Sequence, residues 1–150
     1  MTDTDATRTA PVFTPESANK ALAYIRAVVD DVVDAFARLR TAEEIRARAL
    51  AGSPTTGRTP EARDRTLRDA ENARATARED LVRVNLELEK AGVELKDPET
   101  GLIDFPGERG GRRVYLCWKK GETSVEFWHD VESGFRGRRP IADPDDPPSD

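Results

Sequence analysis

The residues best suited to chemistry gather around the only histidine of the chain. His129 lies close in sequence to Glu126, Asp130 and Glu132, and this is the one cluster that resembles a metal site. Residues three apart in a strand point to opposite faces, so Glu126 and His129 would converge only if the strand ended at Trp128. Transition metals commonly need three or four converging ligands. The pattern favours a histidine hydrogen-bonded to a neighbour at the end of a strand, and it predicts neither a bound metal nor another cofactor.

Alternating residues predict a β-hairpin with one polar face. Strands at 112–118 and 123–129 flank a turn at Lys120-Gly121, which sets Leu116 opposite Val125 and Val114 opposite Phe127. This register gathers the apolar side chains on one face and sends their neighbours to the other. A bulge at Gly121 would instead slip the register and flip one strand.

The polar face of this hairpin is the predicted binding site. In the preferred register Arg113 pairs with Trp128 across the strands, and Tyr115 pairs with Glu126. A guanidinium offers a planar fork to a carboxylate or phosphate, and an indole beside it excludes water. The alternative is that these residues only bond to one another. The predicted ligand-binding residues are Asp104, Arg113, Tyr115, Glu126, Trp128, His129 and Arg138.

No catalytic residue is predicted. The chain lacks a Gly-x-Ser-x-Gly elbow, a His-Glu-x-x-His motif, a phosphate loop and a dinucleotide fingerprint. Cys117 is its single cysteine, which rules out an internal disulfide. It lies beside Trp118 in a strand expected to be half-buried, which predicts an inert thiol.

Two long helices must support this face. Thr14 is a good N-cap and Pro15 suits the first helical position, which predicts a helix over about 15–50. A second helix is predicted over about 60–91, where Gly92 ends it and Val93 supplies the apolar contact that often follows. Both helices carry apolar residues at spacings of three and four, typical of a coiled coil. In the first helix these are Leu22, Ile25, Val29, Val32, Phe36 and Leu39.

The fold class that follows is α+β: a long antiparallel two-helix, coiled-coil-like hairpin followed by a small antiparallel β-meander. Short strands at 93–96 and 102–105 precede the polar hairpin. One domain is predicted over 13–139, with disordered tails at 1–12 and 140–150. The last eleven residues hold four Asp and four Pro, which leaves little apolar surface to bury.

Four apolar residues flank the seams of the two helices and cannot be buried by helix–helix packing alone: Val28, Val33, Val82 and Leu86. Either the predicted β-meander at 93–139, here called the β module, covers them within the chain or a second chain does, and a homodimer is the preferred alternative. The helical tip near the loop at 51–60 has few large apolar residues, so we expect it to be looser than the base.

Four segments of the β module carry a distinctive pattern in this order: Gly101-Leu102-Ile103-Asp104-Phe105-Pro106, Val114-Tyr115-Leu116-Cys117-Trp118, Trp128-His129 and Gly134-Phe135-Arg136-Gly137-Arg138. Together they resemble the bacterial domain of unknown function 2203 family. Phe13-Thr14 with Glu16, Ala18 and Asn19 resembles the family's helix start, although Lys20-Ala21-Leu22-Ala23 stands where the family tends to have Leu-Leu-Pro. The resemblance covers roughly residues 12–141 and implies no settled activity.

Composition narrows the function class without naming a function. With 35% charged residues and a net charge of −5, the chain suits an elongated helical protein and argues against wholesale nucleic-acid coating. No apolar run approaches the length of a membrane span, and the polar start lacks a secretory signal, so a cytoplasmic protein is predicted.

The preferred function is a non-catalytic interaction or ligand-binding module for a protein or a small anionic ligand. The first alternative is a ligand- or metal-dependent enzyme with a pocket around Arg113, Glu126 and His129. The second is an RNA-associated module that uses the basic segment Gly134-Phe135-Arg136-Gly137-Arg138-Arg139, within a region from Gly107 to Arg139 that holds eight Lys and Arg against five Asp and Glu.

Overall fold

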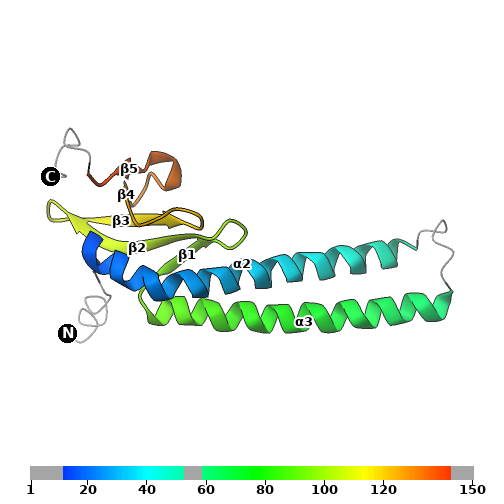
Figure 1. Ribbon diagram of the computed structural model, residues 1–150. Coiled ribbons are helices and arrows are strands. Elements are labelled where there is room, and N and C mark those ends of the chain that lie inside the picture. Colours follow the sequence, from blue (N-terminus) through cyan, green and yellow to red (C-terminus); the bar gives the residue numbers. More distant parts are fainter. Residues whose placement is uncertain (1–11, 53–58, 143–150) are drawn as a thin grey trace, which may run out of the picture.

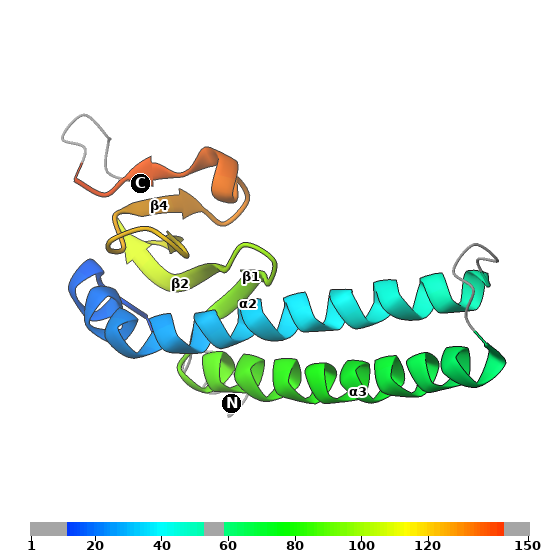
Figure 2. The same ribbon diagram turned by 45° about the vertical axis from the view of Figure 1, so that its right-hand side comes forward.

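The computed structural model describes residues 12–52 and 59–142. Helix α2 (Pro15–Ala51) and helix α3 (Pro60–Lys90) form an antiparallel hairpin, and an antiparallel sheet follows, so the predicted α+β fold is confirmed. Figures 1 and 2 show α2 between the sheet and α3, with the loop ends of both helices projecting beyond the sheet. Most of the expected tails and of the loop at 51–60 lies outside the described residues. No helix in the described ranges is both long and apolar enough to cross a membrane.

Local capping rules place the helix ends where the sequence predicts them. The Thr14 hydroxyl accepts from the Ser17 N–H at 3.0 Å, and the Ser17 hydroxyl accepts in return from the Thr14 N–H at 2.9 Å. After α3, Gly92 has φ of 83° and the Val93 N–H donates to the Leu88 carbonyl at 2.9 Å. Val93 is also buried, which confirms its predicted contact.

The sheet has five strands in sequential order: β1 (Glu94–Asp97), β2 (Leu102–Arg109), β3 (Arg112–Lys119), β4 (Phe127–Asp130) and β5 (Arg139–Pro140). A short 3-10 helix, η2 (Phe135–Gly137), lies between the last two. β2 is longer than predicted because Gly110 and Gly111, with φ of 61° and 78°, form a tight turn into β3. The fold also continues past residue 139, since the Ile141 N–H donates to the Glu126 carbonyl at 2.8 Å.

The base of the hairpin and one face of the sheet share a single core. Large residues of both helices pack there against β2, β3 and β4, including Leu22, Ile25, Leu88, Phe105 and Trp118. Gly101, with φ of 76°, lets the β1–β2 turn approach Val29 and Val33 so closely that a Cβ would lie 2.9 Å from Val29. The β1–β2 turn thus covers Val33, and Val28 is buried in the shared core, whereas Val82 and Leu86 stay 60% and 48% exposed.

The predicted register of the β3–β4 hairpin is wrong by three residues. Leu116 pairs with Trp128 instead of Val125, and residues 120–126 form a connection rather than a strand. Asn19 of α2 explains this, because its side chain accepts from the Val125 N–H at 2.7 Å and donates to the Val125 carbonyl at 3.2 Å. These are the backbone groups that a longer β4 would have offered to β3. An odd shift turns every β4 side chain to the other face.

Candidate functional site

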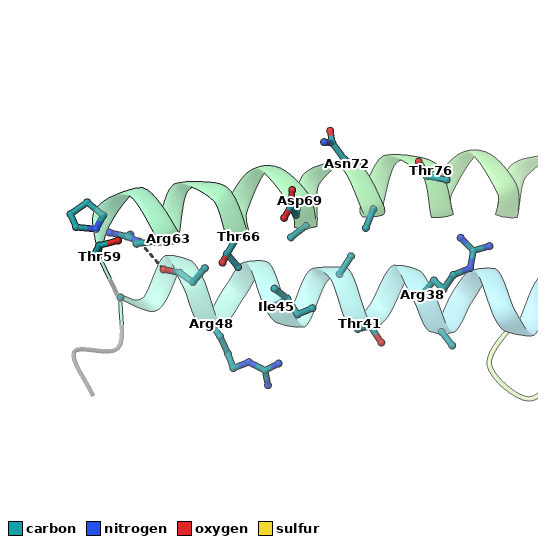
Figure 3. Close-up of a pocket in the computed structure, with 17 residues that line it drawn as sticks. Arg38, Thr41, Ile45, Arg48, Thr59, Arg63, Thr66, Asp69, Asn72 and Thr76 are labelled. Carbon is teal, nitrogen blue, oxygen red and sulfur yellow. Dashed lines mark hydrogen bonds between the residues drawn. The ribbon is translucent and has the colours of Figure 1, made fainter. Parts of the chain in front are cut away.

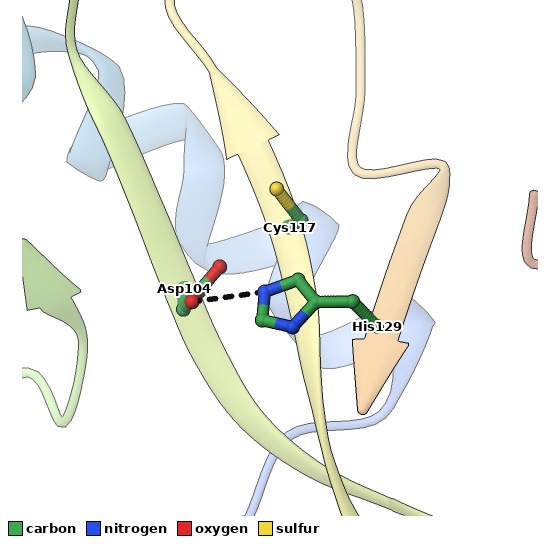
Figure 4. Close-up of side chains that lie close together, drawn as sticks. All are labelled: Asp104, Cys117 and His129. Atoms are coloured by element: carbon green, nitrogen blue, oxygen red, sulfur yellow. Dashed lines mark hydrogen bonds and ion pairs between the residues drawn. The ribbon is translucent and has the colours of Figure 1, made fainter. Parts of the chain in front are cut away.

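Asp104, Cys117 and His129 meet on the sheet face that points away from the helices (Figure 4). Alternation along β2 sends Ile103 and Phe105 into the core and Asp104 to the opposite side. Cys117 lies directly across from Asp104 on β3, and His129 on β4 is one diagonal step away. One donor atom from each residue lies within 4.8 Å of the other two, and all three side chains are buried.

Hydrogen bonds fix the orientation of the imidazole. His129 Nδ1 lies 2.7 Å from the Asp130 carbonyl oxygen, which can only accept, so Nδ1 carries a proton. His129 Nε2 then faces Asp104 Oδ2 at 3.0 Å, and these two atoms share one further proton. The second carboxylate oxygen, Oδ1, is buried without a hydrogen-bond partner among the described residues.

Burial governs the protonation of the other two groups. It raises the pKa of Asp104 above its ordinary value, and the facing His129 ring opposes part of that rise. Burial, with a smaller contribution from the Asp104 carboxylate, raises the pKa of the Cys117 thiol to about 12. In the metal-free protein the thiol is therefore neutral near pH 7.

This arrangement does not suit a cysteine nucleophile. A Cys-His-Asp relay needs a ring nitrogen free to take the thiol proton, and both nitrogens of His129 face oxygen atoms. Reactive thiols also have depressed pKa values and some exposure, whereas Cys117 has a raised pKa and is fully buried.

The same three residues fit a metal ion. Thiolate, imidazole and carboxylate are the ligands that zinc prefers, and a ligating histidine usually donates its other ring N–H to a carbonyl or carboxylate, as His129 does. Ligand atoms around a tetrahedral zinc lie about 3.3–3.6 Å apart. A shift of roughly 1 Å would bring the present atoms to that spacing. No other such group of three potential ligands occurs in the described parts of the chain.

Arg138 lies beside this cluster. Its Nη1 is 3.9 Å from Cys117 Sγ, and its Nη2 forms an ion pair with Glu122 from the β3–β4 connection. On the other flank the Tyr115 hydroxyl donates to Glu94 at 3.0 Å, and its ring centroid lies 5.6 Å from that of His129.

Comparison with known proteins places these residues inside one family domain. The family model described as "Uncharacterized conserved protein (DUF2203)" matches residues 11–141. The chain belongs to the DUF2203 family. No curated protein and no solved structure matches it. The candidate site and its neighbours all lie within the DUF2203 domain.

The structure brings together four of the seven predicted site residues, namely Asp104, Tyr115, His129 and Arg138. The other three lie apart from them because the predicted register was wrong. Trp128 is 1% exposed and packs in the core instead of pairing with Arg113. Glu126 is exposed and bonded to Ser124, and Tyr115 pairs with His129 in its place.

Arg113 instead lines a shallow cleft of about 550 Å³ at the other end of β3. Asp130 and Glu132 line the same cleft, and Asp130 pairs with Arg112 at 2.6 Å. The mixture of charges gives this cleft no clear preference for an anion.

Sequence reasoning missed Cys117 as a member of the site. One signal was available for the site as a whole: Asp104 is a charged residue inside the apolar run Leu102–Phe105. An acidic residue buried among apolar neighbours needs a partner of its own.

A larger groove of about 1230 Å³ lies between the distal halves of α2 and α3 (Figure 3). Its walls in this part of the DUF2203 domain are mostly alanine and threonine, with Ile45 the one large apolar side chain. Among its charged residues Arg63 donates to the Ala49 carbonyl at 2.9 Å, and Arg38 pairs with Asp34 and Asp80. The groove therefore offers shape without a converging set of reactive groups.

Proposed function

We propose that the β module binds a divalent transition-metal ion, with zinc as the best fit. The ligands are a carboxylate oxygen of Asp104, Sγ of Cys117 and Nε2 of His129. One observation carries the proposal: three donor atoms of suitable chemistry, from three adjacent strands, are buried within 4.8 Å of one another. This makes the chain a ligand-binding module whose ligand is an ion.

The competing interpretation is a buried Asp104–His129 pair beside an inert thiol. Such a pair would leave Asp104 Oδ1 with no donor except the weakly donating Cys117 thiol, which is uncommon for a buried carboxylate oxygen. A divalent ion supplies what is missing, because its two positive charges neutralise the Asp104 carboxylate and the Cys117 thiolate together. It also takes the place of the shared proton between Asp104 and His129.

The burial of the ligands favours a structural or regulatory ion over a catalytic one. Three protein ligands leave one position of a tetrahedral zinc ion to a small ligand such as water, and in a catalytic site that position is open to substrate. Here each of the three side chains is at most 3% exposed, and none lines either cavity described above. An ion at this place would join β2, β3 and β4 and so stabilise the folded sheet.

Cobalt titration tests the proposal directly. Chelator-treated protein should bind one Co²⁺ per chain with a sulfur-to-cobalt charge-transfer absorption and the visible bands of a tetrahedral site, and zinc should then abolish both. Asp104→Asn, Cys117→Ser and His129→Gln should each lose or greatly weaken binding. Asp130→Asn is the matched control, since its side chain pairs with Arg112 at the surface and should leave the spectrum unchanged.

Two results would contradict the proposal. One is the absence of a charge-transfer band at micromolar protein and cobalt. The other is a band that persists in the Cys117→Ser or His129→Gln variant, which would place the ion elsewhere.

A further inference from the structure

Arg138 is held in one place by three neighbours. Its guanidinium carbon lies 4.0 Å from the Phe127 ring centroid and 4.3 Å from that of Phe135. Its Nη2 forms the ion pair with Glu122, and its side chain is 18% exposed. Glu122 is fixed as well, because its other carboxylate oxygen accepts from the Lys119 N–H at 3.0 Å. A clamped side chain of this kind loses little further freedom when it donates a hydrogen bond.

The remaining edge of this guanidinium points at sulfur. Arg138 Nη1 lies 3.9 Å from Cys117 Sγ, which is long for a hydrogen bond to a neutral thiol. A thiol is a weak acceptor, so a charged donor aimed at it gains little. A thiolate bound to a metal carries negative charge and accepts strongly, and a charge-assisted bond is about twice as strong as a neutral one.

A purely structural role explains only part of this geometry. Arg138 follows η2 and Glu122 precedes β4, so their pair fastens two connections of the sheet to each other. The two rings and the carboxylate are sufficient for that purpose, and they do not require an N–H group directed at the buried sulfur.

We infer that Arg138 is a positioning residue of the metal site, donating Nη1–H to the Cys117 thiolate once the ion is bound. The inference rests on the proposed metal function and deepens it. The hydrogen bond draws charge from the sulfur, holds Sγ towards Asp104 and His129, and protects the thiolate from protonation. Partners that hydrogen-bond to metal ligands typically contribute 10–100-fold to metal affinity.

The energy of the charge-transfer band reports this bond specifically. Hydrogen bonding to a thiolate stabilises its lone pairs, so more energy is needed to move an electron from sulfur to cobalt. Arg138→Met should therefore shift the band of the Co²⁺ protein to longer wavelength and weaken Co²⁺ binding about 10–100-fold. A residue that only fastens two connections would change thermal stability and leave the band in place.

Two further variants keep the test decisive. Arg138→Lys can retain a charge beside Glu122 but loses the planar fork, so it should fold and still shift the band in the same direction. Arg136→Met is the matched control, because Arg136 is an exposed neighbour in η2 and should change neither the band nor the affinity.

If both Arg138 variants show the charge-transfer band at the wild-type wavelength and bind Co²⁺ with the wild-type affinity, the inference is wrong and the metal site stands. The absence of a band in the wild-type protein would overturn the proposed function itself, and the inference with it.

Discussion

Replacement of Asp104 by asparagine should uncouple metal binding from folding. Asparagine has nearly the same shape, and its amide can donate to Nε2 of a neutral His129 whose Nδ1–H still donates to the Asp130 carbonyl. It also removes a carboxylate whose charged form is disfavoured by burial. The free energy of unfolding of the metal-free protein should therefore change by no more than about 1 kcal/mol.

The zinc-dependent part of stability should be lost. At a free zinc concentration 100 times the dissociation constant, an ion that binds only the folded state adds about 2.7 kcal/mol. For a chain of this size that corresponds to an increase in melting temperature of roughly 5–11 °C. Loss of a ligand should weaken binding by at least about 100-fold, so the variant gains only about 0.4 kcal/mol, or roughly 1–2 °C, at the same free zinc.

Thermal unfolding followed by circular dichroism in zinc buffers measures both quantities on the same samples. Asp130→Asn again serves as the control and should retain the wild-type response to zinc. An equal increase in melting temperature for wild type and Asp104→Asn would refute the assignment of Asp104 as a ligand. No response of the wild type up to micromolar free zinc would refute the site.

Four further predictions concern the rest of the fold. In urea denaturation Leu81→Ala should lower the free energy of unfolding by about 2–4 kcal/mol because Leu81 packs against the core. Leu67→Ala near the tip should lower it much less. Equal losses would contradict a tight base and a looser tip. Trp128→Ala should lower the free energy of unfolding by about 3–5 kcal/mol because the indole is buried. A variant as stable as the wild type would contradict the burial of Trp128. Because the folded-state pKa of Cys117 is raised to about 12, its neutral thiol stabilises the metal-free protein fully below pH 9, and this stabilisation disappears between pH 9 and 12. Between pH 8 and 10.5 the wild type should thus lose about 2 kcal/mol more than Cys117→Ala, and equal losses would contradict the raised pKa. Homodimerisation through the exposed face of α3 stays a prediction: light scattering should give twice 16.6 kDa and Leu86→Glu should halve that mass, whereas a wild-type monomer would exclude it.

Features set by neighbouring residues could be predicted from the sequence. The N-cap at Thr14 and the helix stop at Gly92 depend on hydrogen bonds within a few residues, and both ends are where capping rules place them. The seam of α2 depends on a period of three and four, and Leu22, Ile25, Val29 and Val32 are all buried.

The β3–β4 register could not be predicted in this way. Lys120-Gly121 is an acceptable two-residue turn on local grounds, and alternation favoured it because it separated apolar from polar side chains. The decisive contact joins Asn19 to Val125, which are 106 residues apart in sequence, and no local pattern predicts it. Val125 is buried in either case, so the apolar pattern alone could not distinguish the two arrangements.

The candidate site depends on that same contact. Asp104, Cys117 and His129 are 13 and 12 residues apart and match no ligand motif, so only strand pairing brings them together. In the predicted register Cys117 and Trp128 share the polar face, and His129 lies at its edge. The observed shift of three places Trp128 in the core and turns His129 towards Asp104 and Cys117. Asn19 is not one of the three residues, yet its bonds to Val125 make β4 begin at Phe127, and this start determines which β4 side chain faces the carboxylate. The helix start that resembles the family and the buried cluster in the sheet are therefore parts of one arrangement.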